Sequence, residues 1–385
     1  MTLSGRDIVC VGFSDWDADV PTTQHQLMRR LADHNRILFI ESLGLRRPQL
    51  AGSDLSRMAR RLRRGLSAPR EVDGLYALSP LVLPMHSNAL ARRINAELLP
   101  RAVARAVVKL GLRELLLWSF VPQAEVLLGR LQPARVLYYT TDDHAAKPGI
   151  DAASFRAAES RFAASADVIF ASAPELASRL HQLHDNVHYA PAVTDTRMFA
   201  TALDSDPIDP ALASLPRPRV VFVGAILAAT IDIEMVAQLA ALRPDWSFAF
   251  VGPVGQGDPR TNVDLLRRAP NIHLLGPRPQ ERLPAVLRGA EATIIPYRLE
   301  QQMRSVFPMK TYEYLAAGRP VVSTPLAALA QVPEVLTAVT AEEFAGRLQD
   351  AIEHDSPTRR AARSAAVQSH SWESRLQEIS IALER

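Results

Sequence analysis

The sequence predicts an α/β protein built from two doubly wound domains, and three observations support this fold class. Short apolar segments of strand length alternate with longer segments of helical periodicity along most of the 385 residues. Most of the strand-length segments end in glycine, proline or polar residues, which is typical of parallel strands followed by helices. A stretch rich in aspartate and proline, 201–218, interrupts the alternation once and indicates an interdomain linker. We therefore expect a first domain at 1–200, a second at 219–370 and a final helix at 371–385.

The first domain is expected to open with an apolar strand at 8–13, followed by an amphipathic helix at 22–33. Further strands are expected at 37–41, 114–120, 136–140, 168–171 and 187–190. Helices are expected to end near 131 and to span 155–164 and 174–184. Because strands and helices alternate, the strands should pair in parallel and the helices should cover the sheet.

The second domain repeats this alternation. Its strands are expected at 219–223, 247–251, 272–275, 293–295 and 321–323, and its helices include 231–242 and a last helix at about 372–384. Gly224, Gly252, Gly276 and Pro296 each follow one of these strands. Open α/β sheets bind their ligands at the carboxyl ends of parallel strands, so these turns are candidate ligand contacts.

Composition limits the class of protein. Apolar residues make up 48% and charged residues 22% of the chain, and the net charge is +3, which is ordinary for a globular protein with sizeable cores. The single cysteine, Cys10, excludes an internal disulfide and a cysteine cluster for zinc. No run of apolar residues is long enough to span a membrane. We expect a cytoplasmic protein.

A basic segment lies at 57–64, where Arg57, Arg60, Arg61 and Arg64 share one helical face and apolar residues lie between them. Such a segment can contact anionic lipid at the inner face of a membrane or a polyanionic acceptor. A solvated basic helix explains the same pattern, and both interpretations stay open. Nucleic acid is not an expected partner, because the cluster contains no aromatic residues and no nucleic-acid-binding motif is visible.

The segment 308–324 is the most informative part of the chain. Lys310 opens a short expected helix, Glu313 follows one turn later on the same face, and Gly318 and Pro320 end the helix before a buried strand. A helix N-terminus with an ammonium group beside it suits a phosphate, and a carboxylate one turn deeper can accept hydrogen bonds from the paired hydroxyls of a ribose. The pair indicates a nucleotide site, although a surface Lys–Glu pair on an ordinary helix has the same spacing.

The same segment resembles the P-x-K-x-x-E-Y-L-A-x-G-x-P-V-V stretch of GT-B glycosyltransferases near family 4. The resemblance implies two Rossmann-like domains facing a cleft, with the last helix crossing back to the first domain. It also implies that Lys310 contacts the diphosphate of a nucleotide-sugar donor and that Glu313 contacts its ribose. The other donor-binding candidates are Met309, Gly224, Tyr297 and Arg304.

Two positions depart from the family pattern. Ser305 stands where the family commonly has a second glutamate, and the loop 224–230 lacks the family's basic pair. Phosphate neutralisation is therefore left mainly to Lys310, helped by Arg304 or Arg298. The stereochemical outcome, retaining or inverting, stays open.

Acidic and histidine residues follow two expected strands of the first domain, on the side where GT-B enzymes bind the acceptor. Asp142, Asp143 and His144 follow one strand, and Asp17 and His25 follow another. A carboxylate at the end of a strand can act as general base toward a sugar hydroxyl. Asp143 is the first candidate for this base, Asp142 and His25 are the other catalytic candidates, and Asp17 and His144 are acceptor-side residues. Helix capping and turn formation by Asp142 and Asp143 explain the same pattern.

These observations predict a metal-independent glycosyltransferase (EC 2.4, hexosyltransferase type) that moves a sugar from a UDP-sugar to a glycan or lipid-linked acceptor. No cofactor is expected; residues 15–17 have the D-x-D pattern but lie on the acceptor side, so we do not interpret them as a metal site. Two alternatives remain: a nucleotide-sugar epimerase of the same fold, and a catalytically silent nucleotide-sugar-binding partner in a glycan-assembly complex. A Rossmann dehydrogenase is not expected, because no G-x-G-x-x-G follows the first strand.

Overall fold

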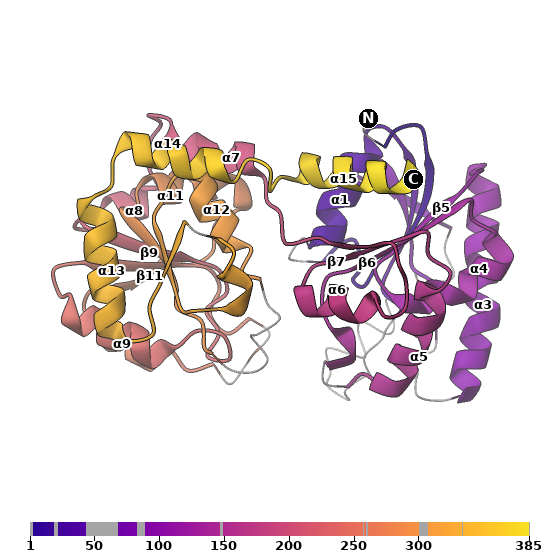
Figure 1. Cartoon of the computed structure of the whole chain (residues 1–385), viewed down its shortest axis with the longest axis horizontal. Helices are drawn as coiled ribbons and strands as arrows, with labels where there is room; N and C mark the ends of the chain where they lie inside the picture. Colours follow the sequence, from indigo (N-terminus) through magenta and orange to yellow (C-terminus); the bar gives the residue numbers. More distant parts are fainter. Residues whose placement is uncertain are drawn as a thin grey trace. The chain divides into compact units, whose positions relative to one another are not determined.

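The computed structural model divides the chain into two compact units (Figure 1). Residues 1–191 and 375–385 form the first unit, and residues 192–374 form the second. The residues that the structure describes are 3–18, 22–43, 68–82, 89–146, 149–256, 258, 261–299, 307–332 and 334–384. Each unit has its own sheet and its own helices, as the sequence predicts.

The sheet of the first unit, in its described part, has the strand order β3-β4-β2-β1-β5-β6-β7-β8. Its strands are β1 Asp7–Val11, β2 Arg36–Ile40, β3 Arg70–Val72, β4 Leu75–Leu78, β5 Leu116–Ser119, β6 Arg135–Thr140, β7 Val168–Ala171 and β8 Val187–Tyr189. The pairs are parallel except for the edge pair β3–β4. The chain winds outward from β1 to β4 and then, in the other direction, from β5 to β8, which makes the unit doubly wound.

Helices accompany this sheet along the chain. They are α1 Thr23–Ala32, α3 Ala89–Leu110, α4 Glu125–Leu131, α5 Ala152–Ala163 and α6 Pro174–Leu180, with the short 3-10 helices η1 Pro122–Ala124 and η2 His144–Ala146. Helices α3 to α6 pack on the same face of the sheet, because their apolar residues share one core with alternate residues of β1, β5 and β6.

The last helix, α15 Trp372–Glu384, packs on the first unit although it lies at the other end of the chain. The buried guanidinium group of Arg375 donates hydrogen bonds to the Tyr139 hydroxyl at 2.6 Å and to the Pro191 carbonyl at 2.9 Å. This return of the chain to the first unit confirms the expectation for the final helix.

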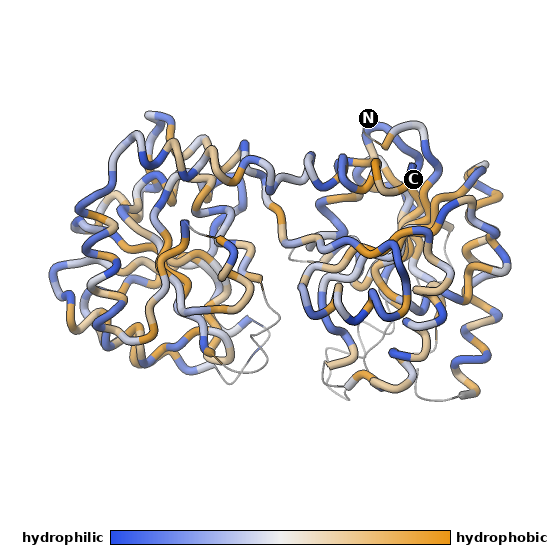
Figure 2. Tube along the Cα trace, viewed as in Figure 1, coloured by the Kyte–Doolittle hydropathy of each residue, from blue (hydrophilic) through white to orange (hydrophobic). Residues whose placement is uncertain are grey.

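The sheet of the second unit has the order β11-β10-β9-β12-β13-β14, all parallel. Its strands are β9 Arg219–Val223, β10 Ser247–Val251, β11 Ile272–Leu274, β12 Ala292–Ile295, β13 Val321–Ser323 and β14 Val335–Thr337. In order of sequence this is 3-2-1-4-5-6, the Rossmann arrangement. Every residue of β9, β10 and β12 is buried, because helices cover both faces of the sheet. Figure 2 shows the corresponding apolar colouring of the central strands.

The helices of the second unit complete the Rossmann-like layers. They are α7 Thr196–Ala200, α8 Pro210–Ala213, α9 Ile233–Leu242, α10 Asp264–Arg268, α11 Leu283–Arg288, α12 Lys310–Ala316, α13 Ala341–Glu353 and α14 Pro357–Ala366, with the 3-10 helices η3 Thr201–Leu203, η4 Gln280–Arg282 and η6 Ala327–Leu329. Helix α12 carries the Lys310–Glu313 pair and leads into β13.

The segment 201–218, expected as a linker, is part of the second unit, and the boundary between the units lies earlier, between residues 191 and 192. This segment carries η3 and α8. Arg288 donates a hydrogen bond to the Thr201 carbonyl at 2.6 Å, and the Asp209 carboxylate pairs with Arg278 at 2.9 Å. The aspartates and prolines of this stretch therefore form local turns that second-unit side chains hold in place.

Candidate functional site

The Lys310–Glu313 pair lies at the start of α12. The Lys310 Nζ atom is 3.0 and 3.2 Å from the two carboxylate oxygens of Glu313. The Glu313 side chain is only 4% exposed, whereas the Lys310 side chain is 26% exposed. Because a buried carboxylate needs a compensating charge, Lys310 balances Glu313 and at the same time keeps a solvent-facing side.

Two other predicted donor residues lie next to this pair. A Cβ atom added to Gly224 would lie 3.9 Å from the Lys310 Cε atom, so the glycine backbone faces the lysine. Tyr297 follows β12, and burial, together with the negative charge of Glu313, raises the pKa of its phenol to about 12. Tyr297 therefore stays neutral and keeps its hydrogen-bonding proton at physiological pH. The structure brings together Lys310, Glu313, Gly224 and Tyr297.

Helix α12 is fixed to the central strand of the sheet by Tyr314. The buried Tyr314 hydroxyl accepts a hydrogen bond from the Val223 amide at 2.7 Å, at the last residue of β9. This contact sets the position of α12 relative to Gly224, the next residue. Tyr314 is a site-positioning residue that the sequence analysis missed, although it lies within the conspicuous 308–324 segment.

The glycines that follow β9, β10 and β11 approach one another through their backbones. A Cβ atom added to Gly252 would lie 1.9 Å from the Gly224 carbonyl oxygen, so only glycine fits there. The Gly252 amide donates a hydrogen bond to the Gly276 carbonyl at 3.0 Å. These three strand ends therefore form a backbone-lined edge next to Lys310, where a ligand can approach the main chain closely.

The remaining donor candidates are Met309, Arg304 and Arg298. Met309 precedes α12 and is 38% exposed. Arg304 lies outside the described residues. The Arg298 Nε atom donates a hydrogen bond to the Ala228 carbonyl at 2.8 Å, so this arginine supports the uncharged loop 224–230.

In the first unit, Asp143 forms an ion pair with Arg156 of α5, in which one guanidinium nitrogen contacts both carboxylate oxygens. Arg156 Nη2 lies 2.7 and 2.5 Å from the two Asp143 oxygens, and one of these oxygens also accepts a hydrogen bond from the Ala145 amide at 3.2 Å. Arg156 reaches further to Glu159 at 3.0 Å, a buried carboxylate that also accepts from the Tyr138 hydroxyl. Asp143 thus has the turn-forming contact expected for it and is oriented by an arginine as well.

The other first-unit candidates differ in exposure. Asp142 is exposed, next to Asp143. His144 is buried, with ring centroids 5.7 Å from Phe13 and 6.1 Å from Phe155. The Asp17 carboxylate pairs with Arg70 at 3.0 Å, and the same arginine pairs with the buried Glu41 at 2.8 Å.

His25 is buried in a capping box at the start of α1. Its Nδ1 atom accepts a hydrogen bond from the Thr22 amide at 2.9 Å, so its Nε2 atom carries the proton and donates to the Asp15 carbonyl at 3.1 Å. Burial lowers the pKa of His25, with a smaller opposing contribution from the Asp15 contact. Both ring nitrogens serve the backbone, so proton transfer by His25 would require one of these bonds to break.

The described residues hold neither a cluster of metal ligands nor a membrane-spanning helix. No group of three or more histidine, cysteine, aspartate or glutamate side chains in this part of the chain is arranged to hold a metal ion. Within the same residues, no helix is both long enough and apolar enough to cross a membrane. The basic segment 57–64 lies outside the described residues.

The second unit is similar in sequence to a known family. Residues 217–354 match the family model described as Glycosyl transferases group 1. We refer to residues 217–354 as the group 1 domain, after this match. This group 1 domain contains the whole 308–324 segment together with Gly224 and Tyr297, which confirms the resemblance drawn from the sequence.

One curated relative supports this result over part of the chain. TuaH of Bacillus subtilis strain 168, named as a teichuronic acid biosynthesis glycosyltransferase, is 36% identical over 105 residues. The match covers 27% of this chain and 26% of TuaH, so the chain matches about a quarter of that relative's length.

Solved structures show the fold of the complete chain. HepE of Anabaena in complex with UDP has a TM-score of 0.66 at 11% identity, and the match covers 98% of this chain and 99% of HepE. The α,α-trehalose 6-phosphate synthase of Burkholderia multivorans has a TM-score of 0.62 at 14% identity, with 99% and 98% covered. The fold is GT-B, as predicted: a first Rossmann-like unit, the group 1 domain, and a last helix that returns to the first unit.

Proposed function

We propose that this chain transfers a sugar from a UDP-sugar to a glycan or lipid-linked acceptor, without the help of a metal ion. The observation that carries the proposal is the Lys310–Glu313 pair, which lies beside Gly224 and Tyr297 within the group 1 domain. HepE, which shares the fold, is described in complex with UDP and glucose, and this supports a UDP donor. The name of TuaH supports a role in polysaccharide biosynthesis.

The donor chemistry follows from charge and exposure. The half-buried ammonium group of Lys310 can turn from Glu313 to the diphosphate and stabilise the negative charge that grows on the leaving group. Glu313 can then accept hydrogen bonds from the ribose hydroxyls, while the neutral Tyr297 phenol can donate one. Gly224 lets the donor approach the backbone.

We assign the acceptor to the first unit, where Asp143 is the proposed general base and Asp142 the second candidate. The ion pair with Arg156 fixes the Asp143 carboxylate in one orientation, which a general base needs in order to reach a hydroxyl. Asp17, His144 and His25 shape the same strand-end region in this proposal. A cytoplasmic location, with contact to the inner membrane face through Arg57–Arg64, belongs to the proposal too.

The direct test measures UDP binding by isothermal titration calorimetry in the Lys310→Met variant. We expect an affinity loss of about 10- to 100-fold, because one charge-assisted contact contributes roughly 1.5–3 kcal/mol. Lys310→Met leaves the buried Glu313 carboxylate uncompensated, so the double variant Lys310→Met/Glu313→Gln separates lost binding from lost stability. Lys109→Met, an exposed lysine of α3 in the first unit, is the matched control.

UDP affinity that is unchanged in a folded Lys310→Met variant would contradict the proposed donor site. A thermal-shift comparison of UDP, GDP, TDP and ADP identifies the nucleotide. Incubation with the matching nucleotide sugar then separates the alternatives: an epimerase interconverts the sugar, and a silent partner binds the donor but releases no nucleotide even over long incubation.

A further inference from the structure

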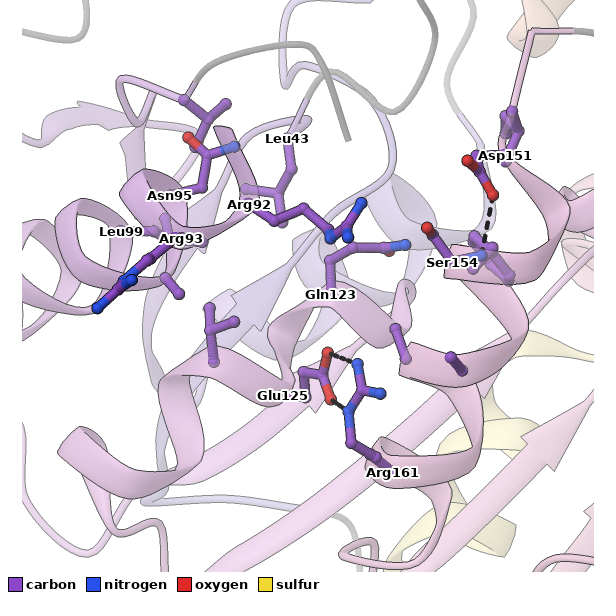
Figure 3. Close-up of a pocket in the computed structure, with 17 residues that line it drawn as sticks. Leu43, Arg92, Arg93, Asn95, Leu99, Gln123, Glu125, Asp151, Ser154 and Arg161 are labelled. Atoms are coloured by element: carbon purple, nitrogen blue, oxygen red, sulfur yellow. Dashed lines mark hydrogen bonds and ion pairs between the residues drawn. The ribbon is translucent and has the colours of Figure 1, made fainter. Parts of the chain in front are cut away.

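A cavity of about 390 Å³ opens in the first unit, within the range of about 300–1,000 Å³ typical of small-molecule sites (Figure 3). Helices α3, α4 and α5 form its walls. Leu43 follows β2, Val82 follows β4 and Gln123 follows β5, so the cavity lies at the carboxyl ends of strands on both sides of β1. The winding direction of the sheet changes there, and doubly wound sheets bind their ligands at such a point.

One part of the cavity is polar. In Figure 3 the guanidinium group of Arg92 and the side-chain amide of Gln123 lie next to each other, with the Ser154 side chain across from them. The Gln123 Oε1 atom is buried and has no hydrogen-bond partner in the described part of the chain. A buried acceptor of this kind calls for a donor from a ligand, such as a hydroxyl group.

The rest of the lining is apolar. Leu43, Leu99 and Phe155 are buried side chains of the wall, and Val82 and Val126 are half-buried. A free sugar or inorganic phosphate would leave these walls without a matching surface. An occupant that fits both parts has a polar head and an apolar tail.

The charges of the lining favour an anionic head. Glu125 and Arg161 neutralise each other in a two-armed ion pair of 2.6 Å contacts, and Asp151 caps α5 by accepting from the Ser154 amide. The lining as a whole carries three arginines, Arg92, Arg93 and Arg161, against the two acids Glu125 and Asp151, so its net charge is +1.

Helix α3, which supplies Arg92 and Arg93, has a basic and partly apolar outer surface. It also carries Arg101, Arg105 and Lys109, against a single acid, Glu97. It exposes Leu90, Leu98 and Val108. A helix of this composition suits the surroundings of an anionic amphiphile.

We propose that this cavity binds the phosphate monoester of a long apolar alcohol. The anionic oxygens of the phosphate accept from Arg92 and Ser154, its remaining P–OH group donates to the Gln123 Oε1 atom, and the chain lies along Leu99, Val126 and Phe155. This assignment rests on the proposed function in one respect: it makes the ligand the lipid end of the acceptor. Binding itself is independent of the donor site in the group 1 domain.

The test measures binding of farnesyl phosphate to the full chain by calorimetry, below the concentration at which the ligand forms micelles. Farnesol, which lacks the head, and inorganic phosphate, which lacks the tail, are the comparison ligands. We expect farnesyl phosphate to bind at least about tenfold more tightly than either, since both parts of the cavity contribute. Equal affinity for farnesol, or for inorganic phosphate, would overturn the proposal.

Two pairs of variants locate the ligand. Arg92→Gln should weaken the binding of farnesyl phosphate about tenfold. Arg105→Gln, on the same helix but away from the cavity, should leave the affinity unchanged. Ala157→Phe places a ring in the cavity and should abolish binding, whereas Ala153→Phe, exposed on the same helix outside the lining, should leave it intact. Equal effects within either pair, in variants that unfold at the wild-type temperature, would place the ligand elsewhere.

The farnesyl phosphate experiment and the UDP experiment test the two proposals separately. Unchanged UDP binding in the Lys310→Met variant would contradict the proposed donor site but would not affect the conclusion drawn from farnesyl phosphate binding. Failure of farnesyl phosphate to bind would remove the cavity proposal while the UDP measurements stand.

Discussion

At the residue scale, the ion pair between Asp143 and Arg156 gives a sharp expectation for catalysis. Asp143→Asn keeps the size of the side chain and its contact with the Ala145 amide but removes the carboxylate proposed as the general base. We expect nucleotide release from the donor sugar to fall by about 10²- to 10⁴-fold, the range that general bases contribute, with UDP affinity unchanged. Steady-state release assays and calorimetry measure the two quantities. Asp142→Asn is the control, and a larger loss in that variant would move the role of base to Asp142.

His25 gives an expectation for stability against pH. Burial lowers the folded-state pKa of His25 below its ordinary value of about 6.5, so the unfolded chain takes up the proton first as the pH falls. The contribution of His25 is therefore fully present above about pH 6.5 and is lost as the pH falls from there towards the folded-state pKa.

The His25→Gln variant isolates this contribution, because glutamine at that position of a capping box can still accept from the Thr22 amide. We expect urea unfolding to show a smaller loss of stability between about pH 7.5 and 5.5 than in the wild type. Burial also lowers the pKa of His273, so this histidine makes its own contribution to the loss of stability at low pH. The His273→Gln variant removes that contribution separately. A pH dependence identical to the wild type would contradict the expected role of His25.

At the scale of elements, the sequence predicts the strands that combine an apolar run with a glycine or polar end. The expected strands at 219–223 and 247–251 agree with β9 and β10 residue for residue. The β3–β4 hairpin was missed, although Asp73 and Gly74 form its turn with φ angles of 47° and 76° and Asp-Gly is a common signal for such turns. Helix α3 was missed as well, because Pro100 interrupts its pattern and its apolar residues do not gather on one side.

Helix α15 gives an expectation about how one buried side chain attaches an element. Arg375→Met keeps the apolar stem but removes the hydrogen bonds to the Tyr139 hydroxyl and the Pro191 carbonyl. Because the buried Tyr139 hydroxyl and the partly buried Pro191 carbonyl lose their partner, we expect the free energy of unfolding of the first unit to fall by about 2–3 kcal/mol. Limited proteolysis should then cleave α15 faster.

Glu378→Gln is the control for this helix. The Glu378 side chain is 55% exposed and pairs with Arg375 at 2.8 Å, and exposed pairs contribute less than about 1 kcal/mol. Equal proteolysis of the two variants would show that the buried contacts of Arg375 do not attach the helix.

At the scale of the whole molecule, the proximity of the proposed donor residues was easier to predict than the cavity. Lys310 and Glu313 are one helical turn apart, so the spacing in the sequence already places them together. The cavity residues Arg92, Gln123 and Ser154 come from three separate helical segments, and only the folded sheet brings them into one place. No periodicity along the chain indicates such a site.

The separate folding units lead to a crossed experiment on the full chain. The proposed UDP site lies in the group 1 domain and the cavity lies in the first unit. Each unit has its own core, so substitutions in one should not affect ligand binding in the other. We expect Lys310→Met to lower the affinity for UDP by about tenfold or more, while the affinity for farnesyl phosphate changes less than about twofold. Arg92→Gln should do the reverse, and the double variant should show the sum of the two binding free-energy changes. Calorimetry with both ligands on all four proteins measures this, and a single substitution that weakens both ligands equally would contradict independent sites in the two units.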